Sequence, residues 1–152
     1  MIAELQPLGY GRDMRTLLFT TLVAISVLGC SKSDKAPAHQ KLSDTVPTIT
    51  VDELDAKLAA HEYQAVDANG DVTRKKMGVI PGAVLLSDSE SFSNSELPTD
   101  KSKTLVFYCA NTHCGASHEA AARALTAGYT NVKVLPDGIA GWVKAGKQTQ
   151  KI

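Results

Sequence analysis

Residues 105–125 read LVFYCANTHCGASHEAAARAL, and this stretch decides the fold. An apolar run typical of a strand ends at Cys109, a short loop of small and polar residues follows, and an alanine-rich helix is predicted from Ala116. This order places a thiol at the carboxyl end of a strand and beside a helix N-terminus. Backbone N–H groups and the helix dipole there favour a thiolate over a thiol. The sequence therefore predicts a nucleophilic Cys109 with a lowered pKa.

Predicted strands and helices alternate along the rest of the folded part. Strands are expected at 48–50, 63–67, 83–86, 104–108 and 131–135, and helices at 51–60, 116–127 and 139–145, with a long polar loop over 87–103 that contains one helical turn. Thr50 and Glu53 have the spacing of a capping box. The alternation predicts an α/β domain whose central sheet is mainly parallel and flanked by helices. Ligands of such sheets bind beyond the carboxyl ends of the strands, which is where Cys109 falls.

Length and charge limit the function classes. The chain has 152 residues, enough for one domain, and its 16 basic and 16 acidic side chains balance. It contains no basic block, so a nucleic-acid partner is not expected. The sequence makes no prediction of oligomeric state.

The N-terminus has the pattern of a secretion signal over residues 1–29. A basic residue is followed by an uncharged apolar run at 16–28, which is short for a membrane span. A start at Met14 would make residues 1–13 a mis-called extension. The alternatives are an uncleaved anchor helix and an ordinary cleaved signal.

The end of this segment, Val27-Leu-Gly-Cys30, resembles a bacterial lipobox. The resemblance implies lipidation at Cys30, a membrane-anchored protein on the periplasmic face of the cell envelope, and, because Ser31 follows the cysteine, the outer membrane. Residues 30–46 would then be a flexible tether rich in Ser, Lys, Asp, Ala and Pro, and residues 47–152 the folded domain. Disulfides can persist in that compartment.

Several short motifs together resemble the rhodanese-like domain family. They are Val66-Asp67, Ile80-Pro-Gly-Ala83, Val106-Phe-Tyr-Cys109, Ser117 with Ala120-Ala121, Gly128-Tyr129, Asn131-Val132, Gly138, Trp142 and Gly146. The resemblance implies a three-layer domain with a five-stranded parallel sheet flanked by helices. It also implies a sulfurtransferase in which Cys109 takes sulfane sulfur from a small sulfur-containing donor as a persulfide and passes it to a thiol acceptor, with no cofactor.

The sequence departs from the family pattern around the active loop. The loop has eight residues, from Cys109 to Ala116, where six are common; its other members are Ala110, Asn111, Thr112, His113, Cys114 and Gly115, and Ser117 follows. Ala116 stands where an Arg usually ends the loop. Other substitutions are Ala68-Asn69 after the first motif strand, Met77-Gly78-Val79 before Ile80, and Asp137-Gly138 in place of a doubled glycine. These departures argue against ordinary thiosulfate turnover and against phosphatase chemistry, which needs the loop Arg.

Cys114 admits three interpretations. It is a resolving thiol that attacks a Cys109 persulfide or sulfenate, a partner in a disulfide that blocks the site until it is reduced, or a partly exposed spectator. Cys109, His113, Cys114 and His118 could also suggest a metal site, but their spacing is not that of zinc ligand sets, so no metal is predicted. His113 is either a proton donor near the thiolate or a solvated loop residue.

Three further residues complete the prediction for the site. Ser117 is expected to cap the helix or to supply a hydroxyl in its first turn. Asp67 and Trp142 are interpreted as structural.

The leading hypothesis is a lipid-anchored periplasmic rhodanese-like protein that handles sulfane sulfur through Cys109. The alternatives are a non-catalytic binding or sensory module and a thiol–disulfide enzyme that uses Cys109 and Cys114.

Overall fold

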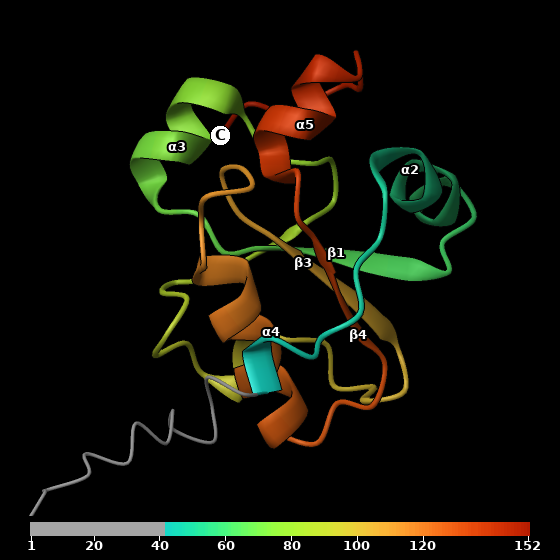
Figure 1. The fold of residues 1–152 in the computed structure, drawn as a ribbon, viewed down its shortest axis with the longest axis vertical. Coiled ribbons are helices and arrows are strands. Elements are labelled where there is room, and N and C mark those ends of the chain that lie inside the picture. The colour runs from blue at the N-terminus through green and yellow to red at the C-terminus, as the bar shows by residue number, and fades with distance from the viewer. Residues whose placement is uncertain (1–41) are drawn as a thin grey trace, which may run out of the picture. The chain divides into compact units, whose positions relative to one another are not determined.

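Four parallel strands form the central sheet of residues 42–152, the part of the chain that the computed structural model describes (Figure 1). The strands are β1 (Tyr63–Asp67), β2 (Val84–Leu85), β3 (Thr104–Tyr108) and β4 (Val132–Leu135), in the order β2-β1-β3-β4. The predicted α/β class with a parallel sheet is confirmed. The predictions for the signal segment, for Cys30 and for residues 31–41 lie outside the described residues. Within the described part, no helix is long and apolar enough to cross a membrane.

The fifth strand that the family resemblance implies is reduced to a single bridge. Thr48 pairs in parallel with Val134 at the free edge of β4. Val134 donates to the Pro47 carbonyl and accepts from the Ile49 amide, each at 2.9 Å. The pairing stops there because Pro47 has no N–H to donate and Thr50 already caps the next helix. The expected strand at 48–50 is therefore wrong in its extent but right in its place.

The helices are α2 (Val51–Ala59), α3 (Asp71–Met77), α4 (Ala116–Thr126) and α5 (Gly138–Lys144), with a 3-10 turn, η1 (Asn94–Glu96), in the polar loop. The hydroxyl of Thr50 accepts from the Glu53 amide at 3.3 Å. The Glu53 carboxylate contacts Lys133 at 3.4 Å, so only half of the predicted capping box is seen.

Helix α3 has no counterpart in the sequence-based prediction. Its buried residue is Arg74, whereas Val72 is 83% exposed. A helix without an apolar stripe leaves no hydrophobic period to detect. The sequence feature that could have indicated this helix is its charge order. Asp71 lies in the first turn and basic residues lie in the last turn, which suits the helix dipole.

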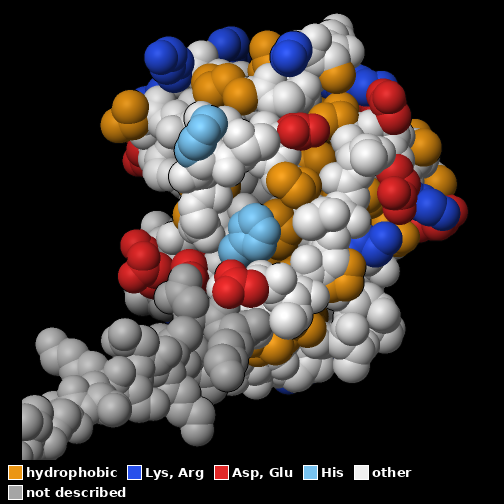
Figure 2. Space-filling model, viewed as in Figure 1, with side chains coloured by type: hydrophobic (Ala, Val, Ile, Leu, Met, Phe, Trp, Pro, Cys, Tyr) orange, Lys and Arg blue, Asp and Glu red, His pale blue; other side chains and the backbone are white. Residues whose placement is uncertain are grey.

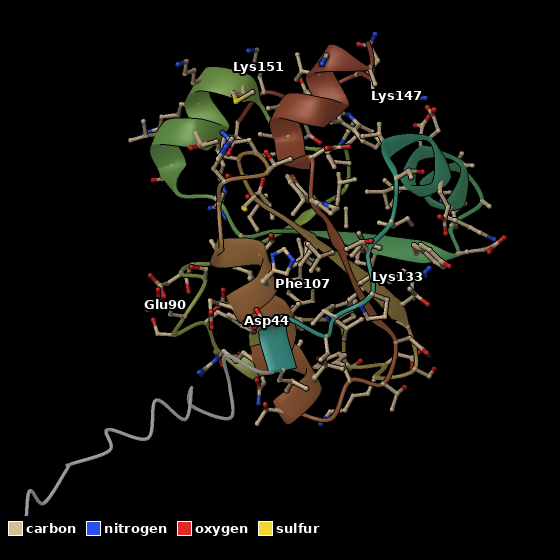
Figure 3. All side chains as sticks on the ribbon, in the orientation of Figure 1. Asp44, Glu90, Phe107, Lys133, Lys147 and Lys151 are labelled. Atoms are coloured by element: carbon tan, nitrogen blue, oxygen red, sulfur yellow. The ribbon has the colours of Figure 1, made fainter. Side chains whose placement is uncertain are left out.

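Alternate residues of β3 pack on opposite faces of the sheet. Leu105, Phe107 and, just beyond the strand, Cys109 join the apolar cluster that contains the α4 alanines. Val106 and Tyr108 join the cluster on the other face, which α2 and α5 cover. Figure 3 shows Phe107 among the side chains between the sheet and α4. This alternation directs the Cys109 thiol toward α4.

Packing of the domain extends into the segment predicted to be a tether. Val46 is 6% exposed and belongs to the α4-side cluster, and Ser43 is 2% exposed. On the other face, Lys147, which is labelled in Figure 3, binds Asp55 of α2 at 2.7 Å and Asp52 at 3.1 Å. The chain that follows α5 is thereby tied to α2.

Candidate active site

Cys109 lies immediately after β3 and is 1% exposed. Its neighbour strand β1 ends at the same edge of the sheet, where the Ala68 amide donates to the Tyr108 carbonyl at 2.9 Å. The thiol therefore stands at the carboxyl edge of two adjacent parallel strands, where α/β proteins place their ligands.

The start of α5 holds the start of the loop. The Ile139 amide donates to the Cys109 carbonyl at 2.9 Å, and the Ala140 amide to the Ala110 carbonyl at 3.0 Å. Gly138 permits this approach, since its φ is +59° and a Cβ there would collide with the carbonyl oxygen of Cys109 and with the backbone of Ala110. The last helix of the domain thus fixes the position of the thiol-bearing residue.

A turn at Asn111 folds the loop back over Cys109. The Cys114 amide donates to the Asn111 carbonyl at 3.0 Å, and the His113 amide donates to the Asn111 side-chain oxygen at 3.0 Å. Residues 111–113 are exposed, whereas Cys114 is partly buried and packs against the cluster that contains Cys109. The turn therefore brings the two cysteines together, and both are free thiols in this structure.

The Cys109 thiol has two close polar contacts. Its sulfur donates to the Cys114 carbonyl at 3.1 Å and lies 3.3 Å from the Ser117 hydroxyl. Ser117 is in the first turn of α4, as one of its two interpretations predicted, and Gly115 is the residue that caps the helix.

Burial first, and hydrogen bonding to Cys114 second, raise the pKa of Cys109 to about 11. The side chain and amide of Ser117 oppose this rise. The predicted lowering of the pKa of Cys109 is therefore wrong. A carbonyl oxygen beside the thiol stabilises the protonated form, and the amides of His113 and Cys114 are directed at Asn111.

His113 lies on the exposed part of the loop. The His113 ring contacts the Thr112 hydroxyl at 3.4 Å on the exposed part of the loop, which agrees with the interpretation of a solvated histidine. Across residues 42–152, no group of three or more His, Cys, Asp or Glu side chains is placed to hold a metal ion. In the orientation of Figure 1, Figure 2 shows histidine side chains on this face, around the loop and the start of α4.

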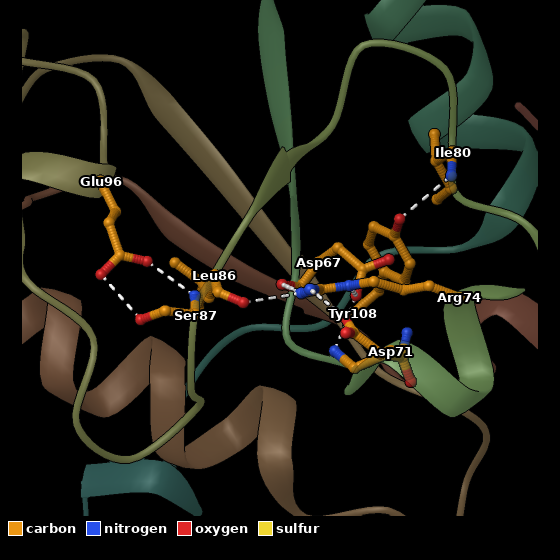
Figure 4. A network of polar contacts seen from close by, with 9 residues as sticks. Asp67, Asp71, Arg74, Ile80, Leu86, Ser87, Glu96 and Tyr108 are labelled. Atoms are coloured by element: carbon orange, nitrogen blue, oxygen red, sulfur yellow. Dashed lines mark hydrogen bonds and ion pairs between the residues drawn. The ribbon is translucent and has the colours of Figure 1, made fainter. Parts of the chain in front are cut away.

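A buried ion pair supports the strand edge beside the loop. Arg74 of α3 is 6% exposed, and its guanidinium lies 3.3 Å from the carboxylate of Asp67 at the end of β1 (Figure 4). It also donates to the carbonyls of Asp67 at 3.1 Å and Leu86 at 2.8 Å. Arg74 thereby connects the ends of β1 and β2 to α3. The structural role predicted for Asp67 agrees with this ion pair, whereas the sequence pattern gave no sign that Arg74 is its partner.

The same network of polar contacts includes Tyr108, the residue before Cys109. The Tyr108 hydroxyl accepts from the Ile80 amide at 3.0 Å (Figure 4), and burial, followed by the Asp67 carboxylate, raises the pKa of Tyr108. Among the described residues, one carboxylate oxygen of Asp67 and the side-chain nitrogen of Asn69 have no hydrogen-bond partner.

A separate cavity of about 420 Å³ lies between α2 and the chain around α5. It is lined by Leu58, Ile80, Pro81 and Trp142, with Asp55 and Lys147 among its charged residues. Cys109 is not among its lining residues. Trp142 is 3% exposed and donates to the Gln148 carbonyl at 2.8 Å, which suits its predicted structural role.

Comparisons with known proteins show the domain family to which this fold belongs. Residues 50–145 match the model of the rhodanese-like domain. The chain is similar to the structure of a thiosulfate sulfurtransferase from Pseudomonas aeruginosa, with 23% identity and a TM-score of 0.60 over 74% of this chain and 22% of that one. It is also similar to the human single-domain sulfurtransferase, with 19% identity and a TM-score of 0.53 over 65% of this chain and 96% of that one.

A third similar structure carries a different description. It is a Rhodopseudomonas palustris protein described as a possible tyrosine phosphatase, with 24% identity and a TM-score of 0.60 over 74% of this chain and 90% of that one. No curated protein matches the chain significantly in sequence. The chain belongs to the rhodanese-like domain family, as its motifs predicted.

Proposed function

We propose that this protein accepts sulfane sulfur on Cys109 as a persulfide. The observation that carries the proposal is the place of the thiol: it lies at the carboxyl edge of β3, faces the first turn of α4, and contacts the Ser117 hydroxyl at 3.3 Å. In a rhodanese-like domain this is the position at which a sulfur acceptor is expected, and the sulfurtransferases among the similar structures share the fold.

The reaction follows from thiol chemistry. Deprotonated Cys109 attacks the sulfane sulfur of the donor, a new S–S bond forms, and the donor's own bond to that sulfur breaks with its electron pair leaving on the donor remainder. Ser117 is the group on the described chain that favours the thiolate, through its hydroxyl and amide. Since the pKa of Cys109 is about 11, the thiolate fraction at neutral pH is small and the first step accelerates with pH.

The test is an intact-protein mass spectrum after treatment with inorganic polysulfide and removal of excess reagent. To prevent later reactions at Cys114, it uses the Cys114→Ser variant. That variant gains the mass of one sulfur atom, and the double variant with Cys109→Ser does not. If both variants gain the same mass, the sulfur acceptor is another residue and the proposal is wrong.

A binding module that has kept the fold is the second candidate function. It is favoured by the resting form of Cys109, which is buried, protonated at neutral pH and donates to a carbonyl oxygen. The same experiment separates the two functions, because a binding module leaves the mass of Cys114→Ser unchanged across polysulfide concentrations.

We further propose that the domain is held on the periplasmic face of the cell envelope by a lipid on Cys30, at the outer membrane. The support is the apolar run at 16–28, the Val27-Leu-Gly-Cys30 motif and Ser31. Several acyl groups anchor a protein firmly, whereas one gives marginal binding. Cys30→Ser should therefore shift the protein from the membrane fraction or block its processing. An unchanged fractionation and mobility would overturn the proposal.

A further inference from the structure

We propose that Cys114 is the resolving thiol of the Cys109 persulfide, so that the pair reduces sulfane sulfur to sulfide and closes a disulfide. This inference rests on the proposed function, since it requires sulfur to reach Cys109 first. According to this inference, the sulfur is released as sulfide and is not stored for transfer to a separate acceptor.

The geometry of the loop carries the first part of the argument. The turn at Asn111 returns Cys114 to Cys109, so that the Cys109 sulfur lies 3.1 Å from the Cys114 carbonyl oxygen. The Cys114 side chain packs against the apolar cluster that contains Cys109. A second thiol on the residue that already contacts the first, and that packs against the same apolar cluster, is placed to attack it.

The second observation is the charge around the Cys109 sulfur. A sulfur atom that replaces the thiol proton of Cys109 would lie on the side of the Cys114 carbonyl oxygen, to which that proton is donated. A persulfide is readily ionised, and its negative outer sulfur is repelled by a carbonyl oxygen. The loop from Cys109 to Ala116 contains no Arg or Lys to offset that repulsion. The site therefore destabilises a stored persulfide and favours departure of the outer sulfur.

The proposed step is balanced without an external oxidant. The Cys114 thiolate attacks the inner sulfur, Sγ of Cys109, and a Cys109–Cys114 disulfide forms. The bond between Sγ and the outer sulfur breaks, and its electron pair leaves with the outer sulfur as hydrosulfide, HS⁻. The sulfane sulfur is reduced by two electrons, and the two cysteine thiols are oxidised to the disulfide.

Turnover then needs a dithiol reductant. Such a reductant attacks the disulfide, forms a mixed disulfide, and leaves as its own cyclic disulfide while both cysteines return to thiols. Cys114 is the more accessible sulfur of the pair, since Cys109 is 1% exposed and Cys114 is partly buried beside the exposed residues 111–113. The reductant is therefore expected to attack at Cys114.

The experiment compares four reduced proteins after one exposure to inorganic polysulfide: wild type, Cys114→Ser, Cys109→Ser and the control Thr126→Ser at the far end of α4. Intact mass and released sulfide are measured, with the sulfide of the Cys109→Ser sample subtracted as background. Wild type and Thr126→Ser should lose the mass of two hydrogen atoms. Cys114→Ser should retain one added sulfur and release one equivalent of sulfide less than wild type, because the polysulfide remainder is set free in both but the outer sulfur leaves only in wild type. With dithiothreitol, wild type should release sulfide repeatedly.

Two results separate failure of this inference from failure of the proposed function. If wild type keeps a persulfide as long as Cys114→Ser does, Cys114 does not resolve it, although Cys109 still accepts sulfur. If neither Cys114→Ser nor a second variant, Cys114→Ala, gains sulfur while their circular dichroism spectra remain native, the proposed function itself fails. A disulfide that forms equally in wild type without polysulfide would assign Cys114 to a blocking role and overturn the resolving role.

Discussion

The main-chain amide of Ile139 donates a hydrogen bond of 2.9 Å to the carbonyl oxygen of Cys109. The two residues are far apart in sequence, and this contact joins the last helix to the residue that we propose accepts sulfur. It forms beside Gly138, whose positive φ and missing side chain leave room for the backbone of the active loop. The stability of the domain and the geometry of the thiol therefore depend on the same junction.

Gly138→Ala should destabilise the domain and disturb the active loop. The added Cβ would collide with the Cys109 carbonyl, and the φ of +59° is strained for any residue with a side chain, so a loss of about 2–5 kcal/mol in the free energy of unfolding is expected. Chemical denaturation measures it. Gly146→Ala is the matched control, because its φ is +74° and nothing lies within 4 Å of its added Cβ. Equal losses in the two variants would show that the contact with the loop is unimportant.

The Cys109 thiol should titrate well above an ordinary thiol. Burial and hydrogen bonding to Cys114 raise its pKa to about 11. The difference in thiolate ultraviolet absorbance between wild type and Cys109→Ser, followed against pH, should therefore have its midpoint near 11. A midpoint below about pH 8 would mean an activated thiolate and would contradict the arrangement described above.

The same shift predicts a loss of stability at alkaline pH. The pKa of Cys109 rises from 9.0 to about 11 on folding, so its stabilising effect is present below pH 9.0 and is lost as the pH rises through about 11. Relative to Cys109→Ser, wild type should lose about 2 kcal/mol of unfolding free energy across that interval. Urea denaturation of both proteins at each pH measures the difference, and a constant difference would refute the linkage.

Arg74→Met should cost far more than the loss of a surface ion pair. It leaves the Asp67 carboxylate buried and unpaired, for which about 3–5 kcal/mol is expected. Lys57→Met is the control: Lys57 binds Glu62 at 2.6 Å on the exposed surface, and its loss should cost less than about 1 kcal/mol. In the double variant Asp67→Asn, Arg74→Met, part of the loss should be recovered. Equal effects of the two single Met variants would show that burial of the Arg74 pair contributes nothing.

The sequence by itself determined the parts of the fold that rest on local apolar pattern. β1 at 63–67 and β3 at 104–108 have the predicted bounds, and α4 begins at Ala116 as expected, because strand alternation and helix-forming alanines are properties of neighbouring residues. The same pattern placed Cys109 at a strand end before a helix. The family motifs could be recognised because each is a short run of consecutive residues.

Only the tertiary structure decided what surrounds these elements. α3 was missed because it packs an arginine against Asp67 instead of an apolar stripe. β2 has only two residues, and Arg74 binds the Leu86 carbonyl just beyond it. The lowered pKa of Cys109 was predicted from the backbone N–H groups and the helix dipole at the start of a helix. In the folded chain, burial and then hydrogen bonding to Cys114 raise it, since desolvation of a thiolate outweighs one helix terminus.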